Sequence, residues 1–102
     1  MKLFTYYPSA GLETSRARAS SSDSRYIAVA HGITYELIRR ADLDGIGPYY
    51  TTPERALRAF VERGEARLVA KDAKLSRGDR RDWRAAISAA KRQLEALPKA
   101  VR

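Results

Sequence analysis

Residues 26–40 read YIAVAHGITYELIRR, and this stretch decides the fold. Its second half alternates, with Ile33, Tyr35 and Leu37 on one side and Thr34, Glu36 and Arg40 on the other; Ile38 is the exception. Gly tolerates the positive φ of a tight turn. We therefore predict a β-hairpin with strands at 26–30 and 33–40, joined by a turn at His31-Gly32.

A helix-turn-helix is the alternative interpretation of the same residues. Ala28, Gly32, Ile33 and Ile38 follow an order that weakly resembles the small–Gly–apolar spacing of that motif. His31, however, stands where an apolar residue normally packs between the two helices. Residues 33–38 are also rich in β-branched and aromatic side chains, which favour a strand. The hairpin is the preferred interpretation, and the helix-turn-helix stays open.

The segment before the hairpin contains one short strand and one irregular stretch. Residues 2–7 carry Phe4, Tyr6 and Tyr7, which favour a strand, and Pro8 ends the run. Residues 9–24 read as irregular, because the run from Ser20 to Ser24 is typical of loops. This stretch carries Arg16 and Arg18, so it is either a plain surface loop or a mobile basic arm.

The segment after the hairpin begins with a turn at residues 42–45, whose Asp-Leu-Asp-Gly sequence is only a fragment of a calcium loop. Residues 46–51 predict a short edge strand. Thr52-Pro53-Glu54 then marks a helix start, with a capping hydroxyl, a proline at the first helical position and an acid at the positive end of the dipole. We expect this helix to span 53–63 and to stop at Gly64.

Two further elements complete the chain. Residues 65–70 alternate as a strand, and residues 71–78 form a polar connection. The longest helix is predicted at 79–97, before Pro98, with one apolar stripe formed by Trp83, Ile87, Ala90, Leu94 and Leu97. The predicted fold class is α+β: a small antiparallel sheet with one short helix and one long C-terminal helix packed on the sheet.

Length and charge set the class of protein. The chain has 102 residues, which is the size of a single domain spanning 1–102 with one modest core. Its net charge is +8, from 20 Lys and Arg against 12 Asp and Glu. Residues 71–102 hold ten of the basic and four of the acidic side chains, so the excess is concentrated there. A basic segment on a nearly neutral body favours a polyanionic partner.

Several chemistries are excluded by the residues present. With no Cys and a single His, the chain has neither a disulfide framework nor a thiolate zinc site. No phosphate-binding glycine loop and no nucleophile elbow occur. We interpret His31 as a turn residue, and the pairs Tyr6-Tyr7 and Tyr49-Tyr50 as one core and one surface residue each. We therefore expect a protein that is not an enzyme and needs no cofactor or metal.

No stretch of the chain is apolar enough to predict a membrane span, and the start lacks the apolar run of a signal peptide. We therefore expect a cytoplasmic protein with no membrane partner.

The basic side chains of the last predicted helix form the first candidate site. At 100° per residue, they fall within an arc of about 120° beside the apolar stripe. The members of this basic flank are Arg80, Arg81, Arg84, Lys91 and Arg92. Four further arginines form a second point of contact: Arg16, Arg18, Arg39 and Arg40.

Arginine forms bidentate bonds to phosphate, so this pattern predicts nucleic-acid binding, with DNA preferred to RNA. The strand–turn–strand–helix order that ends in residues 49–56 resembles that of small DNA-binding modules of mobile-element integrases, in element order alone. The alternative is a phage or mobile-element inhibitor or adaptor, similar to an anti-CRISPR protein. Such a protein would occupy an acidic or nucleic-acid-binding surface of a host complex.

Overall fold

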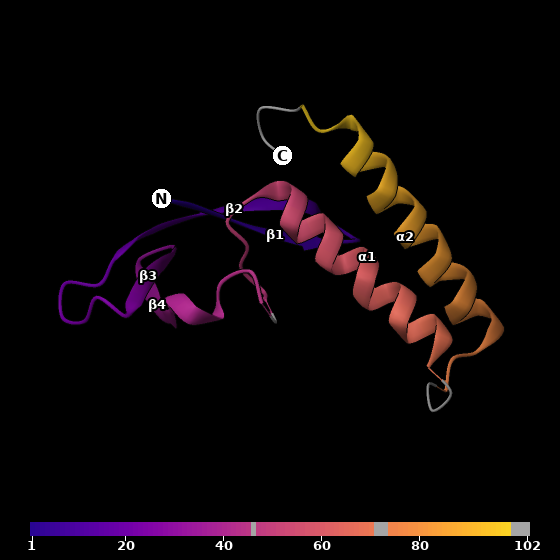
Figure 1. Ribbon diagram of the computed structural model, residues 1–102, viewed down its shortest axis with the longest axis horizontal. Coiled ribbons are helices and arrows are strands. Elements are labelled where there is room, and N and C mark those ends of the chain that lie inside the picture. Colours follow the sequence, from indigo (N-terminus) through magenta and orange to yellow (C-terminus); the bar gives the residue numbers. More distant parts are fainter. Residues whose placement is uncertain (46, 71–73, 99–102) are drawn as a thin grey trace.

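The computed structural model describes residues 1–45, 47–70 and 74–98. Within these residues, four strands are followed by two helices (Figure 1). The elements are β1 (Lys2–Tyr7), β2 (Gly11–Ala19), β3 (Tyr26–His31), β4 (Thr34–Arg39), a 3-10 turn η1 (Arg40–Asp42), α1 (Pro53–Val69) and α2 (Arg77–Ala96). This arrangement confirms the predicted α+β class with an antiparallel sheet.

The sheet has the order β1-β2-β3-β4, and every neighbouring pair is antiparallel. β2 changes partner along its length: residues 11–16 pair with β1, and residues 17–19 pair with β3. β1 and β3 therefore border different parts of β2, which makes the molecule long. Its extents are 48 × 33 × 23 Å and its radius of gyration is 15.5 Å, above the value of about 13 Å for a compact chain of this length.

The hairpin predicted at residues 26–40 is confirmed, with its turn one residue further along. His31 pairs with Thr34, so the turn residues are Gly32 and Ile33 rather than His31 and Gly32. Gly32 takes a φ of +62°, the conformation that suits the first position of a tight hairpin turn. The alternating residues of β4 face solvent, and the exception Ile38 packs against the core.

The prediction of an irregular stretch at residues 9–24 is wrong for its central part, because β2 occupies residues 11–19. Arg16 and Arg18 are strand residues on either side of the buried Ala17. Strand propensity in this segment is low, but its backbone groups find partners in β1 and then in β3. Tertiary pairing thus overrides the local preference.

The predicted strand at residues 46–51 is also wrong for the part that the structure describes, residues 47–51; Ile46 lies outside it. Tyr50 makes only an isolated antiparallel bridge with Phe4, in which each residue's N–H bonds to the other's carbonyl, at 2.8 and 2.9 Å. Pro48 has no N–H to donate, so the segment cannot continue a ladder there.

Helix α1 begins where predicted and ends later. The Thr52 hydroxyl accepts a hydrogen bond from the Arg55 amide at 3.2 Å, and Pro53 is the first helical residue. The helix does not stop at Gly64 but continues to Val69, which replaces the strand predicted at 65–70. Gly64 is buried, and a Cβ placed on it would lie 2.8 Å from Ile87 Cγ1. This glycine permits close contact between helices, and it does not act as a helix stop.

Helix α2 begins at Arg77 instead of Asp79, because Ser76 and Asp79 form a reciprocal capping box. It ends at Ala96, one residue before the predicted Leu97. Of the connection predicted at 71–78, residues 71–73 lie outside the described residues. The apolar stripe of α2 faces α1 instead of the sheet, and α1 lies between the sheet and α2 (Figure 1). The Trp83 ring stacks on Phe60, with centroids 5.9 Å apart.

The described residues contain two buried clusters instead of the single core expected. One lies under the sheet and contains Leu3, Ala17, Ile27, Val29 and Tyr49. The other joins the helices and contains Leu57, Val61, Ile87 and Ala90. Tyr6 and Leu12 from the β1–β2 pair border the second cluster, so this strand pair is shared between the two.

None of the described helices is both long and apolar enough to cross a membrane.

Candidate nucleic-acid interface

One face of the β2–β3–β4 sheet points away from the buried cluster. Ala17, Ile27 and Val29 point into that cluster, so the residues that alternate with them lie on the other side. The register places Arg18 beside Ala28, and Ala28 beside Leu37. We call this surface the outer sheet face; its residues are Arg16, Arg18, Tyr26, Ala28, Ala30, Tyr35, Leu37 and Arg39.

The outer sheet face carries basic side chains and no Asp or Glu at any of its strand positions. Arg16 lies directly opposite Lys2 of β1, and both are exposed. Like charges directly opposite one another on antiparallel strands repel and are destabilising. Among the described residues, no carboxylate forms an ion pair with Lys2, Arg16 or Arg18. An anion bound on this face would relieve that repulsion.

An exposed aromatic ring holds one of these arginines in place. The Arg18 guanidinium lies over the Tyr35 ring, 4.4 Å from its centroid, although the two residues come from β2 and β4. Tyr35 keeps 53% of its surface exposed, and Leu37, next along the same face, keeps 60%. The pair joins a planar cation to a planar ring, which is suited to stacking against other planar groups.

Two hollows border this face. The first has a volume of about 340 Å³ and is lined by Arg18, Ala19, Ser20, Ser21, Ser22, Ala28, Tyr35 and Leu37. The second has a volume of about 430 Å³ and is lined by Arg25, Tyr26, Arg39, Arg40 and Ala41. Neither lining includes an acidic side chain.

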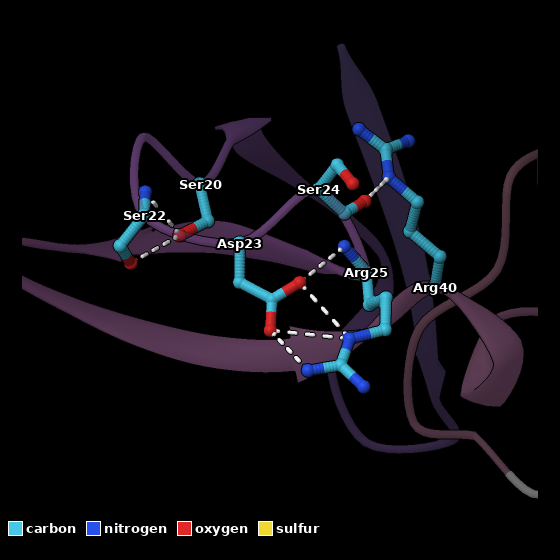
Figure 2. Close-up of polar contacts among 6 residues, drawn as sticks. All are labelled: Ser20, Ser22, Asp23, Ser24, Arg25 and Arg40. Carbon is cyan, nitrogen blue, oxygen red and sulfur yellow. Dashed lines mark hydrogen bonds and ion pairs between the residues drawn. The ribbon is translucent and has the colours of Figure 1, made fainter.

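The loop from Ser20 to Arg25 forms the rim of the first hollow, and its own polar contacts hold it in place (Figure 2). The Ser20 hydroxyl lies 3.2 Å from the Ser22 hydroxyl and accepts from the Ser22 amide at 3.4 Å. The Arg25 guanidinium donates to both carboxylate oxygens of Asp23, the shortest bond being 2.7 Å from Nη2. The loop thus has no regular secondary structure, as predicted for residues 20–24, but these contacts hold it in place and it is not a free arm.

Hydrogen bonds from the Arg25 side chain and amide hold the pKa of Asp23 below its usual range. The same contact raises the pKa of Arg25. Asp23 is thus ionised, with its charge matched by Arg25, and it adds little net negative charge beside Arg18.

Arg39 and Arg40, which sequence reasoning grouped with Arg16 and Arg18, lie at the end of β4. Arg40 Nε donates to the Ser24 carbonyl at 2.9 Å, which ties β4 to the loop (Figure 2). Arg39 Nε contacts Asp42 at 3.4 Å. The fold brings all four arginines to the same part of the molecule, three of them on the outer sheet face and Arg40 lining the second hollow.

The basic flank of α2 is partly used in holding the two helices together. Lys91 Nζ lies 2.9 Å from Glu65 of α1, and Arg80 Nη1 donates to the Leu68 carbonyl at 2.8 Å. Arg81 lies 3.8 Å from its neighbour Asp82.

Arg84 and Arg92 are exposed, and neither forms an ion pair or hydrogen bond with the described residues. Since α1 stands between α2 and the sheet, the basic flank and the outer sheet face are separate surfaces (Figure 1).

A cluster that sequence reasoning missed joins the hairpin tip to residue 49. The Tyr49 hydroxyl lies 3.0 Å from His31 Nε2 and donates to Glu36 Oε2 at 3.2 Å. His31 Nε2 and Glu36 Oε2 are themselves 2.9 Å apart. Burial, and then the Glu36 carboxylate, raise the pKa of Tyr49 to about 12. His31 is thus a strand residue with two partners. Tyr49 is too far from His31 in sequence for a local pattern to predict their contact.

The tyrosine pairs divide as predicted in one case only. Tyr6 is half-buried and Tyr7 is 46% exposed, but Tyr49 and Tyr50 are both buried. Tyr50 is buried because its backbone bridges Phe4 at the edge of β1 and its hydroxyl accepts a hydrogen bond from Arg63.

In the segment with the calcium-loop fragment, the Asp44 carboxylate forms hydrogen bonds with other residues of the protein. It accepts from the Thr51 amide, the Thr51 hydroxyl and Arg55 Nη1, each at 2.7 Å. Burial opposes ionisation of Asp44, but these hydrogen bonds together outweigh it and lower its pKa. The described residues contain no cluster of three His, Cys, Asp or Glu side chains able to hold a metal ion.

A wider groove of about 740 Å³ runs along β4, between Ile38 and Pro48. Its lining includes Glu36 and Asp42. These carboxylates repel phosphate, so this groove is a poorer nucleic-acid site than the outer sheet face.

Comparison of the chain with protein-family models, with curated proteins and with solved structures found no match.

Proposed function

We propose that the protein is a non-enzymatic binding protein for nucleic acid, with DNA as the first candidate and RNA as the second. The carrying observation is the outer sheet face, where Arg18 lies over the exposed Tyr35 ring and Arg16 lies opposite Lys2 of β1. Among the described residues, no carboxylate pairs with these three cations. Phosphates neutralise such a cluster and relieve its internal repulsion, giving salt-sensitive affinity that tolerates many sequences. A cytoplasmic location belongs to this proposal, because nucleic acid is the partner.

The basic flank of α2 is the second contact surface in this proposal. Arg84 and Arg92 are its available members, since Arg80 and Lys91 already bind α1. We expect this flank to add affinity for a long nucleic acid and the outer sheet face to supply most of it.

Charge reversal on each surface tests the proposal. Fluorescence anisotropy would measure binding of labelled single-stranded DNA, duplex DNA and RNA at about 50 mM and about 200 mM salt. Arg16→Glu with Arg18→Glu is expected to weaken binding at least about tenfold, since two charge-assisted contacts become repulsions. Arg84→Glu with Arg92→Glu should cause a smaller loss.

The matched control is Lys74→Glu with Arg77→Glu, which makes the same change in net charge at two exposed residues near the start of α2. Equal losses in all three double variants would mean that net charge, and not the outer sheet face, determines binding. Absence of binding to any nucleic acid at the lower salt would reject the proposal.

Retention of a host protein complex by the same purified protein, with no nucleic-acid binding, would favour the inhibitor or adaptor interpretation. The observation that favours this second candidate is the end of the hairpin, where three large apolar side chains near one another are exposed, those of Ile33, Tyr35 and Leu37.

A further inference from the structure

We propose that the outer sheet face selects unpaired nucleic acid: a single strand lies along it with successive bases in the two hollows. This inference rests on the proposed function and adds the class of nucleic acid bound.

The first hollow has a size and lining suited to one unpaired nucleotide. Its volume of about 340 Å³ is at the lower end of the range for small-ligand sites, which suits one nucleotide and not a duplex. Ala28 and Leu37 are cross-strand neighbours in its lining, so the apolar face of a base can pack against them while the polar edge of the base stays toward solvent. A base in a duplex has its faces covered by its neighbours and cannot enter.

The Arg18–Tyr35 pair lies at the wall of the first hollow. The ring covers one face of the guanidinium at 4.4 Å, which restrains the arginine before any ligand binds. Because Arg18 is exposed, the other face of the guanidinium can stack on a base while its N–H groups donate to a phosphate. Restraint before binding reduces the entropy lost when the strand binds.

Two serines on the rim of the first hollow are held in place. Ser20 and Ser22 are held by their mutual contacts, and the loop behind them is tied to β4 through Ser24 and Arg40 (Figure 2). Hydroxyl groups are common partners of phosphate and sugar oxygens. The Ser20–Ser22 rim therefore offers neutral polar contacts next to the Arg18 cation.

The second hollow lies next to the first along β3. Tyr26, in its lining, stands two residues before Ala28 on the same face of β3, a separation of about 6.6–6.8 Å along a strand. An extended single strand covers about this distance with one nucleotide. Arg40 in this lining forms no ion pair with the described residues and supplies a cation for the next phosphate. Arg25 and Arg39 line the same hollow but already contact Asp23 and Asp42.

The test compares single-stranded DNA with a duplex of the same sequence in the full-length protein and in Ala28→Leu. The wild-type protein is expected to bind the single strand about tenfold more tightly, as one stacked base allows. Ala28→Leu fills the first hollow without a change in charge. It should remove this preference by weakening single-strand binding much more than duplex binding. Ala85→Leu, at an exposed position on α2, is the matched control and should keep the preference.

Ser21→Leu fills the same hollow from its exposed rim and replaces Ala28→Leu if that variant fails to fold, as judged by circular dichroism. Equal affinity of the wild-type protein for single strand and duplex overturns this inference and leaves the proposed function standing. Loss of the preference in Ala85→Leu as well would also overturn it. Absence of binding to either nucleic acid would reject the proposed function itself.

Discussion

Single side chains fix the segment that follows the hairpin. Tyr49 joins this segment to His31 and Glu36 at the hairpin tip, and Asp44 holds Thr51 and Arg55 at the start of α1. The side chains of Tyr49 and Asp44 are partly or largely buried, and their polar atoms form hydrogen bonds. Removing one of the partners therefore leaves a polar group without a hydrogen bond. These contacts position residues 43–45 and 47–51 under the inner face of the sheet.

The raised pKa of Tyr49 predicts a loss of stability at high pH. Below pH 10.0, the ordinary value, the phenol is protonated in both the folded and the unfolded protein. Between pH 10 and about 12 the unfolded chain releases this proton while the folded protein keeps it, so the free energy of unfolding falls as pH rises. Urea unfolding followed by circular dichroism across this window measures the decline.

Tyr49→Phe is the control for this prediction. The variant cannot ionise at this position, so its stability should fall less steeply across the same window. An equal slope in both proteins would show that other groups cause the decline.

The bounds of two elements, β2 and α1, depend on contacts that the intrinsic strand and helix propensities of their residues do not reveal. β2 is a strand because β1 and β3 border it, although its own residues favour a loop. α1 continues past Gly64 because that glycine lies against Ile87 of α2. In both cases a partner distant in sequence satisfies backbone groups or apolar surface, and this outweighs propensities of about 1 kcal/mol or less.

Gly64 provides a stability prediction for the contact between helices. Gly64→Val places a branched side chain where a Cβ already lies 2.8 Å from Ile87 Cγ1. We expect a loss of about 2 kcal/mol or more in the free energy of unfolding, because overpacking exceeds the gain in helix propensity. Thermal and urea denaturation would measure it.

The Ile87→Ala background separates overpacking from other effects of the Gly64 substitution. Removing the Ile87 side chain opens space for valine, so Gly64→Val should cost much less there. A higher melting temperature for the single variant Gly64→Val would contradict the assigned role of the glycine.

At the scale of the whole molecule, charge and apolar burial are both divided in two. One buried cluster supports the sheet and the other joins α1 to α2, with β1 and β2 shared between them. Many of the basic side chains follow the same division: Arg16, Arg18, Arg25, Arg39 and Arg40 lie around the outer sheet face and its loop, and five basic residues form the flank of α2. α1 separates these surfaces, so a short oligonucleotide on the outer sheet face does not reach the basic flank (Figure 1).

This separation predicts the salt dependence of binding. On a short single strand, we expect four phosphates to be neutralised, by Lys2, Arg16, Arg18 and Arg40. The slope of log affinity against log salt concentration is then about −3. The slope should stay within about one unit of this value in Arg84→Glu with Arg92→Glu. Titrations at several salt concentrations would measure both, and a slope near zero would exclude phosphate contacts as the source of affinity.

The sequence by itself determined the α+β class, the strand at residues 2–7, the hairpin, the Thr52 cap and the apolar stripe of the last helix. These features depend on side-chain periodicity, turn residues and caps, which act over a few residues and are therefore visible in sequence.

Tertiary structure alone decided that residues 11–19 form a strand, that Gly64 lies inside a helix, and that α2 packs on α1. It also brought Arg18 over Tyr35 and Tyr49 to His31. Each depends on groups that are distant in sequence and meet only after the chain has folded, because pairing and burial between elements outweigh local preference.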